Sequence, residues 1–166
     1  MTDPLVDGTR VGELVSVLTE HGKTVATAES LTAGMLAATI AGVAGASAVL
    51  RGGLVVYATD LKSTLGGVDR ARLAEDGPVA ASTARALAEG ARERCGADWG
   101  VGLTGVAGPD AQGGQQVGTV FVGLAGASGT SVKELRLDGD RWTIRKSAVS
   151  VAVSELLGRV KETSGG

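Results

Sequence analysis

The stretch Thr24-Val-Ala-Thr-Ala-Glu-Ser-Leu-Thr-Ala-Gly34 decides the fold, because it predicts a strand that ends in a polar turn and leads into a helix. The stretch Gly53-Leu-Val-Val-Tyr-Ala-Thr-Asp-Leu-Lys62 has the same pattern. In an open α/β sheet, ligands bind at the carboxyl ends of the strands. Ser30 follows the first strand and Lys62 follows the second, so both are expected at one shared site.

Hydrophobic periodicity predicts strands and helices in alternation along the chain. We expect strands near residues 24–28, 52–58, 99–104, 117–124 and 131–137, and helices near 8–21, 32–43, 80–95 and 141–160. A short helical turn is expected to hold Lys62, and Gly126 to Gly129 is typical of a hairpin. This alternation favours an α/β fold, and the hairpin makes the sheet mixed.

Composition narrows the class of protein. The chain has 166 residues, which fits a single domain over residues 1–166. Lys+Arg number 16 and Asp+Glu 18, for a net charge of −2, and no basic block predicts nucleic-acid binding. The single cysteine, Cys95, excludes a disulfide within the chain and a cysteine-cluster zinc site. No run predicts a membrane span or a signal peptide, so we expect a soluble, cytoplasmic protein with no membrane partner.

Several familiar catalytic motifs are absent. The sequence has no G-x-x-x-x-G-K-[ST] phosphate loop, no G-x-G-x-x-G turn before a helix and no G-x-S-x-G elbow. His21 is its only histidine, so the usual base of a Ser-His-Asp triad is nearly missing, and an H-E-x-x-H zinc site, which needs two histidines, is excluded. A serine nucleophile would therefore need a different base.

Ser30 and Lys62 can supply such a couple, although each also has a structural interpretation. Ser30 could simply cap the following helix, since serine is common there. Its position would equally allow the free amides at the helix start to hold an oxyanion. Lys62 could be a solvated lysine, or it could act as a base if burial lowers its pKa. Together the two side chains indicate acyl transfer.

Further polar residues follow the predicted strands. Tyr57, the only tyrosine, could be a core aromatic or could orient a proton near the lysine. The turn from Thr104 through Gly105 to Pro109 could offer backbone N–H groups to an anion, or could be only a tight turn. Arg141 and Arg145, four residues apart on one helix face, are typical of a solvated face, yet one of them could bind a phosphate.

Taken together, these segments resemble the C-terminal domain of the competence-damage-inducible protein CinA, which also occurs alone as nicotinamide-nucleotide amidase. The resemblance extends roughly from Val11 to Leu157. It rests on five segments: residues 28–34, 53–62 with 65–68, 104–109, 117–120 and 139–145.

The resemblance implies a three-layer α/β/α fold with a mixed, mostly parallel sheet. It also implies hydrolysis of the carboxamide of nicotinamide mononucleotide to nicotinate mononucleotide and ammonia, without a metal or cofactor. The small nucleotide would be the substrate partner, and pairing into a homodimer is a further expectation. The catalytic residues would be Ser30, Lys62 and Tyr57. The substrate-binding residues would be Thr32, Gly34, Ser47, Thr104, Gly105 and Arg145.

Two segments depart from the family pattern. The family often has Cys-Thr-Gly-Gly after its serine, where this chain has Leu31-Thr-Ala-Gly34. It often has Lys-Pro where this chain has Gln115-Gln116, which would weaken a phosphate contact. The family's common N-terminal molybdopterin-binding-like domain is not expected in 166 residues. A non-catalytic nucleotide-binding module of the same fold is the alternative function, and a different amide-bearing nucleotide is a third option as the substrate.

Overall fold

A computed structural model describes residues 3–164 and contains one five-stranded sheet. The strand order is β2-β1-β3-β4-β5. Strands β1, β2 and β3 pair in parallel, whereas β4 pairs antiparallel with both β3 and β5. Four strands therefore run in one direction and β4 runs against them, which confirms a mixed, mostly parallel sheet. The strands are β1 (Val25–Glu29), β2 (Leu50–Val55), β3 (Trp99–Gly105), β4 (Thr119–Gly126) and β5 (Gly129–Arg136).

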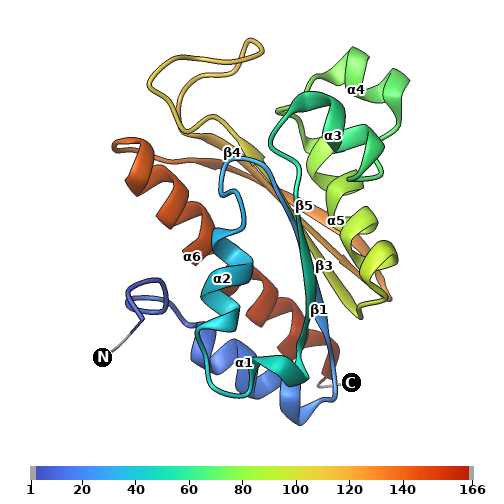
Figure 1. Ribbon diagram of the computed structural model, residues 1–166, viewed down its shortest axis with the longest axis vertical. Helices are drawn as coiled ribbons and strands as arrows, with labels where there is room; N and C mark the ends of the chain where they lie inside the picture. The colour runs from blue at the N-terminus through green and yellow to red at the C-terminus, as the bar shows by residue number, and fades with distance from the viewer. Residues whose placement is uncertain (1–2, 165–166) are drawn as a thin grey trace.

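Helices cover both faces of the sheet and complete a three-layer arrangement (Figure 1). Helices α1, α2 and α6 pack on one face, and α5, with α3 and α4 beside it, lies on the other (Figure 1). The helices are α1 (Val11–Glu20), α2 (Met35–Ala41), α3 (Thr59–Thr64), α4 (Arg70–Asp76), α5 (Ala81–Cys95) and α6 (Arg141–Ser164), with the 3₁₀ turn η1 at Ala46–Ala48. None of the helices in residues 3–164 is long and apolar enough to cross a bilayer.

Glycines in β3 and β4 explain how α5 packs so closely on the sheet. A Cβ atom added at Gly102 would lie 2.4 Å from the Ala84 carbonyl oxygen, and one at Gly100 would lie 2.0 Å from the Ala88 oxygen. Gly123 in β4 meets the same Ala84 oxygen at 2.3 Å. Because any side chain at these positions would collide with helix backbone, the glycines set the distance between the layers.

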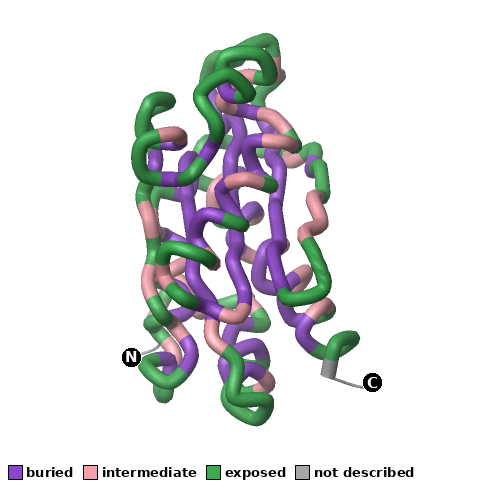
Figure 2. The backbone as a smooth tube through the Cα atoms, turned by 90° about the vertical axis from the view of Figure 1, so that its right-hand side faces the viewer, coloured by how far each residue is buried: buried purple, intermediate pink, exposed green. Residues whose placement is uncertain are grey.

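The core follows from this arrangement. Figure 2 shows the central strands as buried along their length, with exposed residues gathered in loops and outer helix faces. The larger apolar cluster joins the sheet to α1, α2 and α6, and two smaller clusters lie on the α5 side. Strand β2 lies at one edge, and its residues alternate between half-buried and exposed.

The structure differs from the expected elements at several points, among them β2, which spans Leu50–Val55 instead of residues 52–58. Helix α2 begins at Met35 instead of Thr32, because the chain first makes a turn that ends with Gly34 in the left-handed region at φ +92°. Strand β4 begins at Thr119, two residues later than expected. Helix α4 was not expected at all; Asp69 starts it by accepting a hydrogen bond from the Arg72 N–H.

Replacing Gly102 with alanine should destabilise the fold by about 1–3 kcal/mol, because the added methyl group overpacks the contact with α5. Gly158 in α6 is the matched control, since a Cβ atom there meets nothing within 4 Å. Gly158→Ala should stabilise the protein by about 0.5–1 kcal/mol through helix propensity. Urea unfolding of both variants measures the two effects. Equal stabilities would contradict close packing of α5 on β3.

Candidate active site

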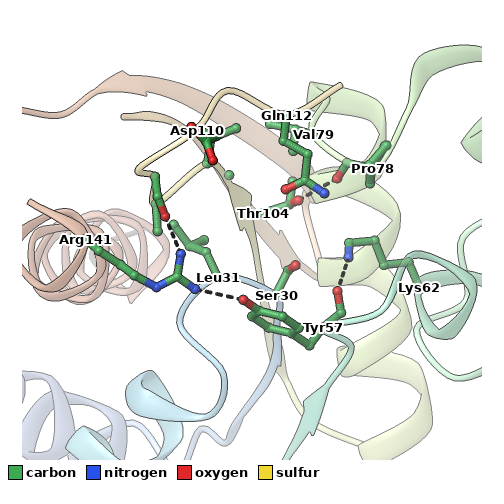
Figure 3. Close-up of a pocket in the computed structure, with 14 residues that line it drawn as sticks. Ser30, Leu31, Tyr57, Lys62, Pro78, Val79, Thr104, Asp110, Gln112 and Arg141 are labelled. Carbon is green, nitrogen blue, oxygen red and sulfur yellow. Dashed lines mark hydrogen bonds between the residues drawn. The ribbon is translucent and has the colours of Figure 1, made fainter. Parts of the chain in front are cut away.

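A pocket opens at the carboxyl ends of β1, β2 and β3, where the sequence predicts the site (Figure 3). Ser30 lies between Tyr57 and Thr104, and Lys62 reaches in from α3 on the side opposite Arg141 (Figure 3). The pocket is lined by Ser30, Leu31, Tyr57, Lys62, Pro78, Val79, Thr104, Gly105, Val106, Ala107, Gly108, Asp110, Gln112 and Arg141.

Lys62 is a buried lysine without a carboxylate partner among residues 3–164. Its side chain is only 2 % exposed, and its Nζ donates hydrogen bonds to the backbone oxygens of Val56 at 3.0 Å and Tyr57 at 3.1 Å. Burial lowers the pKa of Lys62 from 10.5 to about 8, while the nearby Asp60 carboxylate acts in the opposite direction. Such a shift raises the neutral fraction near pH 7 by about 300-fold.

Ser30 shares the pocket with Lys62 but does not bond to it directly. It is 8 % exposed, and its backbone N–H donates to the Leu103 oxygen at 2.9 Å, which continues the pairing of β1 with β3. No hydrogen bond in residues 3–164 occupies the Ser30 hydroxyl. The hydroxyl is therefore available to a substrate, a water molecule or a reoriented Lys62 side chain.

Glu29 fixes the turn that follows Ser30. This fully buried carboxylate accepts hydrogen bonds from the N–H groups of Leu36 at 2.8 Å and Ala37 at 3.1 Å, at the start of α2. It also accepts from the hydroxyls of Thr27 at 3.1 Å and Thr32 at 2.7 Å. The helix-start amides are thus already occupied, and the expectation that they hold an oxyanion is wrong.

Arg141 bridges two segments that border the pocket. Its Nη1 donates to the Gly108 oxygen at 2.5 Å, and its Nη2 donates to the Tyr57 hydroxyl at 2.8 Å (Figure 3). A guanidinium has five N–H donors, so further donors are available to a ligand. Tyr57 is 55 % exposed, which places its ring at the rim instead of in the core.

The back of the pocket is polar. The Thr104 hydroxyl is buried and donates to the Pro78 oxygen at 2.5 Å, so its lone pairs can accept a hydrogen bond from a ligand. Asp110 and Gln112, from the loop after β3, also line the pocket, and Gln112 lies beside Thr104 (Figure 3). Within residues 3–164, no group of three or more His, Cys, Asp or Glu side chains is arranged to hold a metal ion.

Comparison with known proteins identifies the family. A model of the CinA C-terminal domain matches residues 9–160. This chain belongs to the CinA C-terminal domain family. It is 46 % identical over 147 residues to a CinA-like protein of Frankia casuarinae, covering 89 % of this chain and 34 % of that protein. It is 43 % identical over 153 residues to a putative competence-damage inducible protein of Bacillus pumilus, covering 92 % and 37 %. The chain therefore spans about a third of the length of these curated relatives.

Solved structures agree with this assignment. The competence/damage inducible protein CihA from Agrobacterium tumefaciens matches with a TM-score of 0.84 and 34 % identity, over 89 % of this chain and 94 % of that one. A competence or damage-inducible protein from Enterobacter asburiae matches with a TM-score of 0.87 and 29 % identity, over 93 % and 99 %. The α/β/α architecture is thus that of the CinA superfamily.

In this CinA domain, five of the nine residues expected at the site line the pocket: Ser30, Tyr57, Lys62, Thr104 and Gly105. Thr32 is instead fully buried against Glu29, and Gly34 precedes α2 as its left-handed N-cap. Both shape the turn after Ser30 and lie outside the residues that line the pocket.

Ser47 and Arg145 also lie outside the pocket lining. Ser47 is exposed in η1, before β2 begins, and so lies at the opposite end of the sheet from Ser30. Arg145 is directed toward the turn after Ser30: its Nε donates to the Leu31 oxygen at 2.8 Å and its Nη2 to the Thr32 oxygen at 3.5 Å. Arg145 therefore reaches the site through the backbone of that turn.

Arg141 is the pocket residue that sequence reasoning ranked too low. Strand β5 runs parallel to β3, so its carboxyl end lies at the pocket edge of the sheet. Asp140 then starts α6 by accepting from the Thr143 N–H at 2.8 Å. Arg141 is the first residue of α6 and thus lies nearest that edge, whereas Arg145 is one turn further away. The direction of β5 is therefore the feature that would have indicated which of the two arginines lies at the pocket.

The lowered pKa of Lys62 predicts a pH-dependent stability. Between about pH 8 and pH 10.5 the unfolded chain binds the proton that the folded chain has lost, so stability rises with pH. Below pH 8 the buried charge costs about 3 kcal/mol. Lys62→Met should therefore be more stable relative to wild type at pH 7 than at pH 10, by about 2–3 kcal/mol in urea unfolding. The exposed Lys146→Met is the control, and a difference independent of pH for Lys62→Met would contradict the shift.

Proposed function

We propose that this CinA domain hydrolyses the carboxamide of nicotinamide mononucleotide, giving nicotinate mononucleotide and ammonia. The observation that carries the proposal is the buried Lys62, with a pKa of about 8, in one pocket with the unbonded hydroxyl of Ser30. A buried lysine without a carboxylate partner costs stability, which is typical of a group retained for its chemistry. The family resemblance supports this substrate.

The two acceptors of Lys62 support its role as the base. A neutral amine has two N–H donors and one lone pair, and the oxygens of Val56 and Tyr57 can take both donors. The lone pair then faces away from these oxygens and is free to accept a proton. Ser30 shares the pocket and carries a hydroxyl that no hydrogen bond occupies in the described residues, so it is the candidate nucleophile.

The reaction would run in two acyl-transfer steps. Ser30 Oγ bonds to the amide carbon while its proton passes to Lys62 and the carbonyl oxygen takes up negative charge. The C–N bond then breaks, and the proton on Lys62 passes to the leaving nitrogen to give ammonia. Water, deprotonated by Lys62, hydrolyses the nicotinoyl ester and restores Ser30.

The pocket also suits the rest of the nucleotide. The lone pairs of Thr104 Oγ1 can accept from the carboxamide N–H. Arg141 carries spare donors for a phosphate, and the half-exposed Tyr57 ring lies beside it. The Asp110 carboxylate, which also lines the pocket, suits the ribose hydroxyls or the cationic pyridinium ring.

A binding-only nucleotide module is the second candidate. One observation favours it: no hydrogen bond joins Ser30 to Lys62 in the described residues. A binding module would take up nicotinamide mononucleotide without releasing ammonia. Calorimetric binding measured alongside turnover distinguishes the two functions.

Purified protein should release ammonia from nicotinamide mononucleotide, and Ser30→Ala should reduce turnover by more than a thousandfold. Lys62→Met should lose nearly as much, because a nucleophile and its base act as a unit, and the double variant should be little worse than either. A coupled ammonia assay gives the rates, and circular dichroism checks the fold. A Ser30→Ala enzyme of near-normal rate would refute the nucleophile.

The rate should depend on pH through Lys62. A base works only when deprotonated, so kcat/KM should rise with pH and level off above about 8. Lys146→Met, which changes an exposed lysine on α6, should leave the profile unchanged. An optimum below pH 6 would indicate a carboxylate base instead.

Arg141→Ala should lower kcat/KM for nicotinamide mononucleotide by roughly ten- to a hundredfold, because a charge-assisted contact contributes about 1.5–3 kcal/mol. Its effect on the dephosphorylated riboside should be smaller. Arg145→Ala, which loosens the turn after Ser30, should affect both compounds equally. If instead only Arg145→Ala discriminates between them, Arg145 binds the phosphate and the proposed pose is wrong.

A further inference from the structure

We propose that the backbone N–H groups of Leu31 and Ala107 form the oxyanion hole of this site. The inference rests on the proposed acyl transfer, because an oxyanion arises only when Ser30 attacks a carbonyl. The start of α2, the obvious source of such donors, is excluded because the Glu29 carboxylate holds the Leu36 and Ala37 amides. The stabilising donors must come from elsewhere in the pocket.

Leu31 and Ala107 carry buried amides without acceptors. The two residues line the pocket with Ser30 and are 4 % and 5 % exposed. Neither N–H makes a hydrogen bond within residues 3–164. Buried backbone N–H groups are nearly always paired in folded proteins, so unpaired N–H groups on residues that line one pocket indicate a missing acceptor. Val79 also lines the pocket with an unpaired N–H, but the Pro78 oxygen of its peptide plane accepts from the Thr104 hydroxyl, so this N–H points away from Thr104.

The direction of the Leu31 N–H is set by its own peptide plane. The Ser30 carbonyl oxygen in that plane accepts a hydrogen bond from the Ala33 N–H at 3.0 Å. In a trans peptide the N–H points opposite to the C=O. The Leu31 N–H therefore points away from Ala33, and it belongs to the residue directly after the nucleophile.

The Ala107 peptide is held in the same manner. The Val106 oxygen accepts from the Gly118 N–H at 2.8 Å, and the Val106 N–H donates to the Thr119 oxygen at 2.9 Å. The Ala107 N–H thus points away from Gly118. Gly108 also has an unpaired N–H, but no hydrogen bond within residues 3–164 holds the Ala107 oxygen of its plane.

The two donors come from separate, rigid segments. One amide follows the nucleophile, and the other comes from a loop after the neighbouring strand, to which Ser30 is already bonded through the Leu103 oxygen. Unrelated serine hydrolases pair their oxyanion donors in this way. Because both peptide planes are fixed before substrate binds, the donors need no reorganisation when charge develops.

A boronate probe tests the assignment independently of turnover. Boron in 3-pyridineboronic acid replaces the carboxamide carbon, accepts the Ser30 oxygen as its fourth ligand and becomes tetrahedral and anionic, while the serine proton passes to Lys62. A crystal structure of wild type with this compound should place one boronate oxygen within hydrogen-bond distance of the Leu31 and Ala107 nitrogens. An oxygen held by Gly108, Tyr57 or Thr104 instead, or no bond from Ser30 to boron, would overturn the proposal.

A backbone ester measures the contribution of one donor. Replacing Ala107 with L-lactic acid removes its N–H while keeping its shape, and the same replacement at the exposed Ala111 in the same loop is the control. The ester at 107 should lower kcat about a hundredfold with little change in KM, because losing one oxyanion donor costs roughly 10²–10³ in kcat. An unchanged kcat, or a loss only in KM, would overturn the role of Ala107.

The two experiments separate this inference from the proposed function. A seated boronate in a protein that releases no ammonia from nicotinamide mononucleotide would support the oxyanion hole and reject the substrate. Ammonia release together with a boronate oxygen bound at other donors would keep the function and reject the oxyanion hole.

Discussion

The buried carboxylate of Glu29 is the interaction on which the site depends. It ends β1, accepts four hydrogen bonds, and thereby connects the strand, the turn after Ser30 and the start of α2. A carboxylate without exposure is tolerated only when its oxygens are satisfied, and here two hydroxyls and two amides satisfy them. The same bonds remove the α2 amides from catalysis. Donors for a developing oxyanion must therefore come from other segments that line the pocket.

Close backbone packing between the segment after α3 and helix α5 is the second constraint on the site. The Gly66 oxygen, directly beyond the α3 region that carries Lys62, lies 2.0 Å from where a Cβ atom at Gly90 of α5 would stand. The absence of side chains there lets the segment after α3 press against α5. The Lys62 amine itself is held by the backbone oxygens of Val56 and Tyr57, which follow β2. Lys62 is buried in this packed region, and its burial lowers its pKa.

Much of this could be predicted from the sequence, and the failures have physical causes. Alternation of strands and helices gave the mixed α/β sheet, and the strand-end positions gave Ser30, Lys62 and Thr104, because parallel strands end at one edge. The turn after Ser30 was mistaken for helix because Ala33, at φ +47°, adopts a conformation that alanine rarely takes. The sequence also did not predict the hydrogen-bond partners of Glu29, because one of them, the Ala37 N–H, lies eight residues away across that turn. Predicting that Arg141 lines the pocket and Arg145 does not required the direction of β5, because that direction places the start of α6 at the pocket edge of the sheet.

Lys62 and Arg141, the two cationic side chains that line the pocket, differ in burial and so suit different roles. A catalytic base must lose its proton near neutral pH, whereas a phosphate ligand must keep its charge. A lysine can be shifted by desolvation, but an arginine stays protonated in nearly any environment. Lys62 lies in the buried position and Arg141 at the exposed rim, so each residue type occupies the place where its chemistry is useful. Above about pH 8, where Lys62 is mostly neutral, Arg141 gives the mouth of the pocket its positive charge. That charge draws an anionic phosphate toward the rim and leaves the uncharged end of the substrate to Ser30 and Lys62.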